Sequence, residues 1–105
     1  MPIATIAGVE IEVDEEGFIL EPDKWTPEIG EELAKEVGSS PMDEERWKVV
    51  HALRSYYQEY GMVPPLRQIT KVTGVDMKRL YELFPYGPGK GPAKIGGLTK
   101  PAGCV

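Results

Sequence analysis

The feature that most constrains the fold is a repeat of apolar side chains at helical spacing between residues 43 and 61. The side chains that recur every three or four positions, and so share one face of a helix, are Trp47, Val50, Leu53, Tyr57 and Tyr60. Asp43 can accept hydrogen bonds from free amides of the first turn, and Gly61 suits the left-handed residue that ends many helices. The pattern predicts a long central core helix.

Shorter helices are predicted on both sides of this segment from their start and stop residues. The residues that bound them are Thr26 with Pro27 and Gly38, Pro65 and Gly74, and Asp76 and Pro85. Threonine and aspartate cap free amides, proline loses nothing at a first helical position, and glycine ends a helix in the left-handed conformation. We therefore expect helices over 27–37, 65–73 and 77–84.

In the first residues of the chain, apolar side chains recur at every second position instead of at helical spacing. Residues 3–6 and 9–13 alternate between apolar and polar side chains around Ala7 and Gly8, as half-buried strands do. A polar turn at 14–17 then leads to the apolar segment 18–20, which should pack on the core. The fold class predicted for residues 1–84 is mainly α, a small helical bundle with an N-terminal β-hairpin.

The amino-acid composition of the chain changes at Pro85. Six of the last 21 residues are glycine and four are proline, so this stretch can form neither a long helix nor a central strand. It carries Lys90, Lys94 and Lys100 and no acidic side chain. The sequence predicts that residues 85–105 are a flexible, basic C-terminal arm.

Charge is divided unevenly between the two halves of the chain. Residues 1–45 carry 14 acidic and two basic side chains, a net charge of −12, whereas residues 46–105 have a net charge of +7. Such asymmetry can mark an acidic face and a basic face with different partners, or it can only keep a small domain in solution. The acid-free arm favours the first interpretation.

Length and composition limit the number of domains and the cellular location that we expect. The 105 residues allow one domain with one modest core, which we expect to be monomeric when free. No stretch approaches the roughly 20 apolar residues of a membrane span, and the first residues lack the pattern of a signal peptide. We therefore expect a cytoplasmic protein with no membrane partner.

Cys104, the next-to-last residue, is the strongest candidate for chemistry. It is the only cysteine, which excludes an internal disulfide, and with the single His51 it cannot assemble a metal site, so no metal and no cofactor are expected. A cysteine is often only a small apolar core residue, but a thiol in a glycine-rich chain end has little core to join. No neighbouring base activates it, which favours carriage of a group over unaided catalysis.

Two further features have an ordinary structural interpretation beside a functional one. Residues 65–84 have the outline of a helix-turn-helix, with Lys78 and Arg79 in the second helix, but nucleic-acid readers are normally basic and this chain has a pI of about 4.9. His51 is interpreted as a packing or surface residue of its helix in preference to a catalytic base. The aromatic side chains at helical spacing are interpreted as core and core-edge residues.

The end of the chain carries a specific resemblance. Residues 83–105, which read LFPYGPGKGPAKIGGLTKPAGCV, are similar to the C-terminal signature of the DsrC/TusE family. Further matches are DEEGF at 14–18, ERW at 45–47 and PPLR at 64–67, so that the resemblance spans nearly the whole chain. It implies a helical bundle with an N-terminal hairpin and a mobile arm, in agreement with the residue patterns.

The resemblance also implies a function. Members of the family carry sulfur on the penultimate cysteine, here Cys104, as partners (gamma subunits) of dissimilatory sulfite reductase or as relays of persulfide sulfur toward tRNA thiolation. Full DsrC proteins have a second arm cysteine eleven positions upstream, where this chain has Ala93. An intramolecular disulfide or trisulfide is therefore impossible here, as in one-cysteine TusE-type members, although the short stretch 71–76 resembles certain DsrC proteins of thermophiles.

The leading hypothesis is a sulfur carrier of sulfurtransferase type, rather than a stand-alone enzyme, that accepts sulfane sulfur on Cys104 and passes it to a sulfite reductase or sulfurtransferase partner. Lys90, Lys94 and Lys100 would steer the arm toward an anionic sulfur site or an acidic partner. The alternatives are a non-catalytic docking subunit or regulator of sulfite reductase, motivated by Ala93, and a helix-turn-helix nucleic-acid binder.

Overall fold

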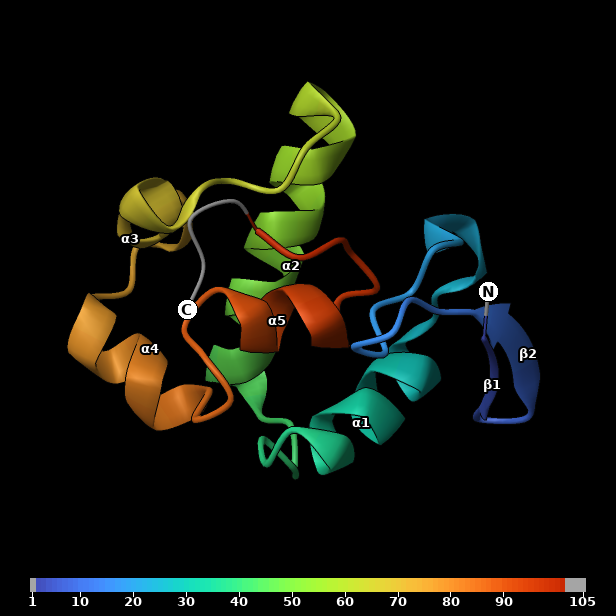
Figure 1. Cartoon of the computed structure of the whole chain (residues 1–105). Coiled ribbons are helices and arrows are strands. Elements are labelled where there is room, and N and C mark those ends of the chain that lie inside the picture. Colours follow the sequence, from blue (N-terminus) through green and yellow to red (C-terminus); the bar gives the residue numbers. More distant parts are fainter. Residues whose placement is uncertain (1, 102–105) are drawn as a thin grey trace.

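The computed structural model describes residues 2–101, which form a helical bundle flanked by a two-stranded antiparallel sheet (Figure 1). In chain order the elements are β1 (Ile3–Ile6), β2 (Val9–Glu12), the 3-10 helix η1 (Pro22–Lys24), α1 (Pro27–Glu36), α2 (Glu44–Tyr60), the 3-10 helix η2 (Leu66–Gln68), α3 (Ile69–Thr73), α4 (Met77–Leu83) and α5 (Lys90–Ile95). The predicted fold class, a mainly α bundle with an N-terminal hairpin, is confirmed.

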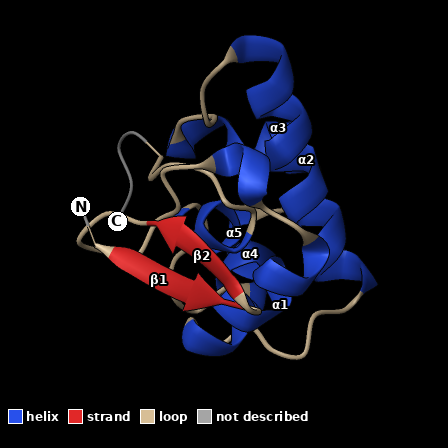
Figure 2. Ribbon diagram, turned by 90° about the vertical axis from the view of Figure 1, so that its right-hand side faces the viewer, coloured by secondary structure: helices blue, strands red, loops and turns tan. Residues whose placement is uncertain are grey.

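The hairpin pairs β1 with β2 in the register Ile3 to Glu12 through Ile6 to Val9. Its turn is tight because Ala7 and Gly8 both have positive φ, 51° and 79°, the combination that suits the twist of a two-residue hairpin. The inward side chains of the strands belong to a second apolar cluster that also includes Ile29 and Leu33 of α1. Figure 2 shows the sheet on one side of the bundle.

The capping residues begin the helices where they were expected. The side chains of Thr26, Asp43 and Asp76 accept hydrogen bonds from the third amide of α1, α2 and α4, at 3.3, 2.9 and 2.9 Å. Gly61, with φ +72°, ends α2. Tyr60, predicted on the core face, is 59% exposed, because the last turn of α2 projects beyond the helices that cover the rest of it (Figure 1).

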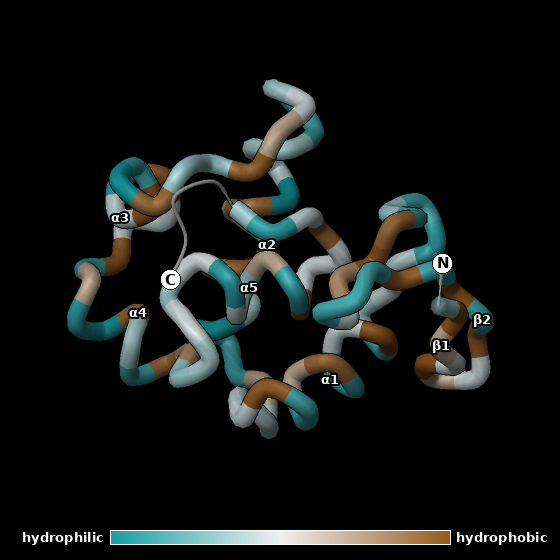
Figure 3. Tube along the Cα trace, in the orientation of Figure 1, coloured by the Kyte–Doolittle hydropathy of each residue, from teal (hydrophilic) through white to brown (hydrophobic). Residues whose placement is uncertain are grey.

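The main core lies between α2, α4 and α5. Its fully buried side chains include Phe18, which confirms that the segment after the polar turn packs inward. Other buried side chains of this core include Val50, Leu53, Leu80, Phe84, Ile95 and Leu98. Hydrophobic stretches also recur along both strands and α1, where the second cluster lies (Figure 3). None of the helices within residues 2–101 is long and apolar enough to span a bilayer.

The structure differs from the sequence-based prediction at the start of the C-terminal segment. A flexible arm was expected from Pro85, but residues 87–89 and 91–98 are all buried. Within them α5 packs against both α1 and α2, and Figure 1 shows it in the middle of the bundle. Glycines make this possible because they let helices and loops approach closely. The division of the chain at residues 84 and 85 into two domains stays a prediction.

Candidate functional site

The candidate site is the chain segment that leads to Cys104. Cys104 itself lies outside the described residues, so the site is built from residues 85–101 and from the side chains that hold them. The last residue of this segment, Pro101, is buried, whereas Thr99 and Lys100 before it are exposed. The course of the segment toward Cys104 therefore depends on the groups that fix the end of α5 and the glycines after it.

Two side chains from distant parts of the chain bind the carbonyl groups at the end of α5. The indole Nε1 of Trp25 donates a hydrogen bond of 2.7 Å to the carbonyl oxygen of Ile95, and Nη1 of Arg54 donates one of 2.5 Å to that of Gly96. The Arg54 guanidinium also lies over the Trp25 ring, 3.9 Å from its centroid. Burial lowers the pKa of Arg54 from its usual value. Because helix C-terminal carbonyls carry partial negative charge, the partly buried Arg54 cation is well placed here.

Glycines allow these contacts. A Cβ atom on Gly97 would lie 2.5 Å from Cδ1 of Trp25, and the φ of Gly97 is +70°. A Cβ on Gly91 would lie 2.9 Å from Cβ of Phe84. Only glycine fits at these two positions without displacing an aromatic side chain, which accounts for part of the glycine content of the segment.

The three lysines predicted to steer the arm are brought together around Glu16 and Tyr86. The Nζ of Lys94 is 2.9 Å from the Glu16 carbonyl oxygen and 5.1 Å from the Tyr86 ring centroid. Lys90 lies 4.9 Å from the same ring, and Lys100 Nζ is 3.3 Å from Oε1 of Glu16. Lys94 is only 7% exposed, Lys90 is partly buried, and Lys100 is exposed. The steering role of all three stays a prediction.

Ala93, the position of the second cysteine in full DsrC proteins, lies within α5 and is fully buried. Its methyl group is part of the main core cluster. A side chain at this position therefore faces the bundle. The chain forms a packed helix at the place where the resemblance implied a mobile arm.

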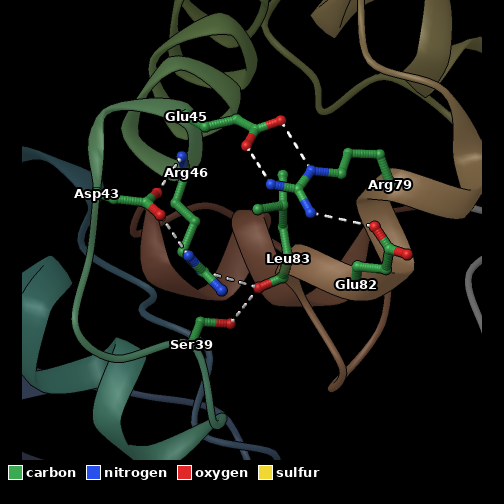
Figure 4. Close-up of polar contacts among 7 residues, drawn as sticks. All are labelled: Ser39, Asp43, Glu45, Arg46, Arg79, Glu82 and Leu83. Carbon is green, nitrogen blue, oxygen red and sulfur yellow. Dashed lines mark hydrogen bonds and ion pairs between the residues drawn. The ribbon is translucent and has the colours of Figure 1, made fainter.

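The helix-turn-helix outline is explained by packing. Arg79 of α4 makes two hydrogen bonds to the Glu45 carboxylate of α2, at 2.6 and 3.0 Å, and one of 3.1 Å to Glu82. Figure 4 shows this guanidinium between the two carboxylates. Arg79, a candidate for contact with nucleic acid, is thus already bound by acidic groups that would repel phosphate. This geometry supports the structural interpretation of the pair.

A second arginine joins the same two helices. Arg46 pairs with Asp43 at 2.6 Å, and its Nε donates a 3.1 Å hydrogen bond to the carbonyl oxygen of Leu83 at the end of α4. The hydroxyl of Ser39 donates to the same oxygen at 3.1 Å (Figure 4). His51 is exposed and stacks on Trp47 with ring centroids 5.5 Å apart, which agrees with its interpretation as a surface packing residue.

Trp25, Arg54 and Glu16 hold the segment, and none of them was identified from the sequence. Trp25 and Arg54 bind backbone carbonyls 70 and 42 residues away, and Glu16 binds a side chain 84 residues away. No local sequence pattern indicates contacts over such separations. The Gly96–Gly97 pair was the available signal, since adjacent glycines beside an apolar helix indicate a close approach of another group.

These features define a class of protein, a small helical bundle that binds its own glycine-rich C-terminal segment and continues from there to a single cysteine. The family model described as "DsrC like protein" matches residues 5–105. The chain belongs to this family.

Two relatives match the chain over all or nearly all of its length. The chain is 44% identical, over all of both sequences, to the gamma subunit of dissimilatory-type sulfite reductase of Nitratidesulfovibrio vulgaris. It is 35% identical to the sulfurtransferase TusE of Escherichia coli, covering 93% of this chain and 95% of that one.

Solved structures have the same fold. A chain in the crystal structure of dissimilatory sulfite reductase I superposes with a TM-score of 0.87 at 40% identity, covering 99% of this chain and 100% of that one. The solution structure of Allochromatium vinosum DsrC gives 0.85 at 37% identity, covering 98% and 97%. The oxidized gamma subunit of Archaeoglobus fulgidus gives 0.79 at 37% identity, covering 99% and 100%.

Proposed function

We propose that this protein is a sulfur carrier that accepts sulfane sulfur on Cys104 as a persulfide and passes it to a partner enzyme. The observation that carries the proposal is the family match, which spans residues 5–105 and so includes the only cysteine. The names of its relatives, a sulfite reductase subunit and a sulfurtransferase, both belong to sulfur chemistry.

The transfer needs no external oxidant or reductant. The Cys104 thiolate attacks the outer sulfur of a donor persulfide, a new S–S bond forms to Cys104, and the donor S–S bond breaks, its electron pair leaving with the donor thiolate. In delivery an acceptor thiolate attacks the outer sulfur on Cys104, and Cys104 leaves as the thiolate. The persulfide proton stays with the transferred sulfur or exchanges with water, so each step balances.

The packed segment limits how far from the bundle Cys104 can reach. Trp25 and Arg54 hold the chain at residues 95 and 96, and Cys104 follows Lys100 by four residues. Four residues span at most about 14 Å, so a partner must come close to the bundle unless the segment leaves its packed position. A partner that reaches the thiol can therefore also recognise the folded surface beside the packed segment.

The partner favoured is the catalytic part of dissimilatory sulfite reductase. The identity to a gamma subunit of that enzyme is 44%, against 35% for TusE, and a chain from a sulfite reductase crystal structure has the TM-score of 0.87. A relay toward tRNA thiolation is the other destination that a relative's name supports. Both destinations are consistent with action in the cytoplasm.

Intact-protein mass spectrometry tests the proposal. The reduced protein is incubated with inorganic polysulfide, and we expect a gain of about 32 Da, the mass of one sulfur atom, that dithiothreitol removes. Because Cys104 is the only cysteine, Cys104→Ser must lose the gain completely. No gain on the wild-type protein with polysulfide, or with a persulfidated sulfurtransferase, would contradict persulfide carriage.

Ala93 supports a second candidate, a docking subunit that carries no sulfur. Without a second cysteine the chain cannot release its cargo as an intramolecular disulfide. Cys104→Ala distinguishes the two functions when added to the sulfite reductase catalytic subunits in a turnover assay. Stimulation that survives the substitution identifies a docking subunit, and stimulation that is lost identifies a carrier.

A further inference from the structure

A groove of about 450 Å³ lies beside the last described residues of the chain. Its walls come from the last turn of α2, from the stretch between α2 and η2, from Arg67 of η2, and from residues 99–100. In Figure 1 that stretch, in yellow-green, passes above the red end of the described chain. The lining residues that give the groove its chemical character are Tyr57, Met62, Val63, Arg67, Thr99 and Lys100.

The charge of the groove is positive. Arg67 and Lys100 line it, and the described residues of its wall include no aspartate or glutamate. Arg67 is exposed and forms no ion pair with any residue in the range 2–101. Lys100 pairs with Glu16 at 3.3 Å, but both side chains are 40% exposed or more, so this pair is weak and can be exchanged for another carboxylate.

The groove also exposes apolar surface. Met62 on its wall is 58% exposed, and Tyr57 and Val63 line the groove with it. A single exposed apolar side chain is ordinary, but here three apolar or aromatic side chains line one groove. Exposed methionine adapts its shape to a partner and is frequent on binding surfaces.

The backbone of one wall, residues 61–65, is constrained before any partner arrives. Gly61 has the left-handed conformation that ends α2, Pro64 is buried, and Pro65 has the fixed φ of its ring, −65°. A wall whose backbone is constrained loses little backbone entropy when the groove is filled. Its mixed lining suits a peptide segment with acidic and apolar side chains better than a small inorganic anion, which would leave Met62 and Val63 without a contact.

We propose that this groove docks an acidic, partly apolar segment of the protein that exchanges sulfur with Cys104. The inference rests on the proposed function, because it assigns the surface through which that exchange is made specific. Thr99 and Lys100 belong both to the groove and to the segment that continues to Cys104. A partner segment in the groove is therefore held within four residues of the thiol.

The test uses the full-length protein and the purified catalytic subunits of dissimilatory sulfite reductase, with binding measured by calorimetry at two salt concentrations. Arg67→Glu and Met62→Asp should each weaken binding at least about tenfold, since a docking centre concentrates its affinity in a few side chains. Lys78→Glu is the matched control, because it makes the same change of charge sign on an exposed residue of α4 outside the groove. It should change the Kd less than about twofold.

A second readout separates this inference from the proposed function. Polysulfide loading of Cys104 needs no partner, so all three variants should gain one sulfur like the wild-type protein. Normal loading with unchanged affinity of Arg67→Glu, or no binding by the wild-type protein, overturns the docking groove and leaves the carrier intact. Failure of the wild-type protein to load overturns the carrier instead.

The competing occupant is a small sulfur anion. Sulfite is titrated into isotope-labelled protein in the absence of any partner. Saturable amide shifts at Met62, Val63 and Thr99 that Arg67→Glu abolishes, together with unchanged partner affinity of Met62→Asp, would identify an anion site and overturn the docking proposal. No saturable shift with sulfite, and a weakened complex for Met62→Asp, support a peptide segment.

Discussion

The indole Nε1 of Trp25 lies 2.7 Å from the carbonyl oxygen of Ile95, and this hydrogen bond joins residues 70 positions apart in the chain. Trp25 precedes α1, whereas Ile95 is the last residue of α5, so the bond ties the start of the bundle to the segment that continues to Cys104. Arg54 repeats the arrangement at Gly96 and covers the Trp25 ring. Long-range polar contacts therefore fix the position of the C-terminal segment together with the burial of Ile95 and Leu98 in the core.

Trp25→Phe should lower the free energy of unfolding by about 1 to 2 kcal/mol, because it removes the donor and leaves a partly buried carbonyl with one partner fewer. Urea unfolding followed by circular dichroism measures the change. The matched control is Trp47→Phe, which also replaces an indole but removes no hydrogen bond within residues 2–101. Equal destabilisation by the two substitutions would mean that lost packing area, not the bond to Ile95, is responsible.

Gly97→Ala should destabilise the protein more than Gly74→Ala. The two glycines have nearly the same φ, +70° and +72°, so each substitution incurs a similar left-handed backbone cost of about 1 kcal/mol. At Gly97 the new Cβ would also lie 2.5 Å from Trp25 Cδ1, whereas at Gly74 nothing lies within 4 Å. The difference between the two variants in urea unfolding, about 1 to 3 kcal/mol, measures the close approach alone. No difference would mean that Trp25 moves aside freely.

The helices and the hairpin were predictable because their signals are local. Asp43, Thr26 and Asp76 each cap an amide three residues away, and Gly61 ends α2 through its own backbone conformation. Such interactions are visible in a window of a few residues. The third predicted helix divided into η2 and α3, since Pro65 sets an extended entry that begins with a 3-10 turn.

The packing of residues 87–98 was not predictable, because a flexible arm and a closely packed segment can have the same high content of glycine and proline. What distinguishes the two is the set of groups on the other side of the contact, Trp25, Arg54 and Phe84. Cys104 was identified from its place in the chain and from the family signature, and it lies outside the described residues. The sequence therefore points to Cys104 as the proposed sulfur-carrying residue, but it contains no local signal for Trp25 and Arg54, which hold the segment before it.

Glu45→Gln should make stability less sensitive to acid. The hydrogen bonds from Arg79 hold the pKa of Glu45 below its usual 4.5. The unfolded chain therefore binds the proton more readily, and the stability that Glu45 contributes is present above about pH 4.5 and lost as the pH falls through the folded-state value. Melting temperatures between about pH 5 and pH 3 should fall less steeply in the variant than in the wild-type protein.

Glu44→Gln is the control for this pH dependence. Glu44 is the exposed neighbour of Glu45 and forms no ion pair within residues 2–101. Because the Glu45–Arg79 pair is itself largely exposed, the effect of Glu45→Gln should also shrink at high salt, where exposed charges are screened. Identical pH curves for Glu45→Gln and Glu44→Gln would contradict a role for the α2–α4 ion pair in acid stability.

Ala93→Cys tests whether the segment is packed in solution as it is in the structure. In a Cys104→Ser background the introduced thiol is the only one. Because Ala93 is fully buried, only a local opening exposes this thiol in the folded protein. It should therefore react with iodoacetamide at least about 100-fold more slowly in the folded protein than in urea. Ser55→Cys in the same background places a thiol on an exposed position of α2 and should react at nearly the same rate in both conditions. Fast reaction at position 93 would show that α5 leaves the core readily. Slow reaction would mean that a cysteine at position 93 reaches Cys104 or a partner only after Trp25 and Arg54 release the segment. The release of the segment would then govern any chemistry that needs both thiols.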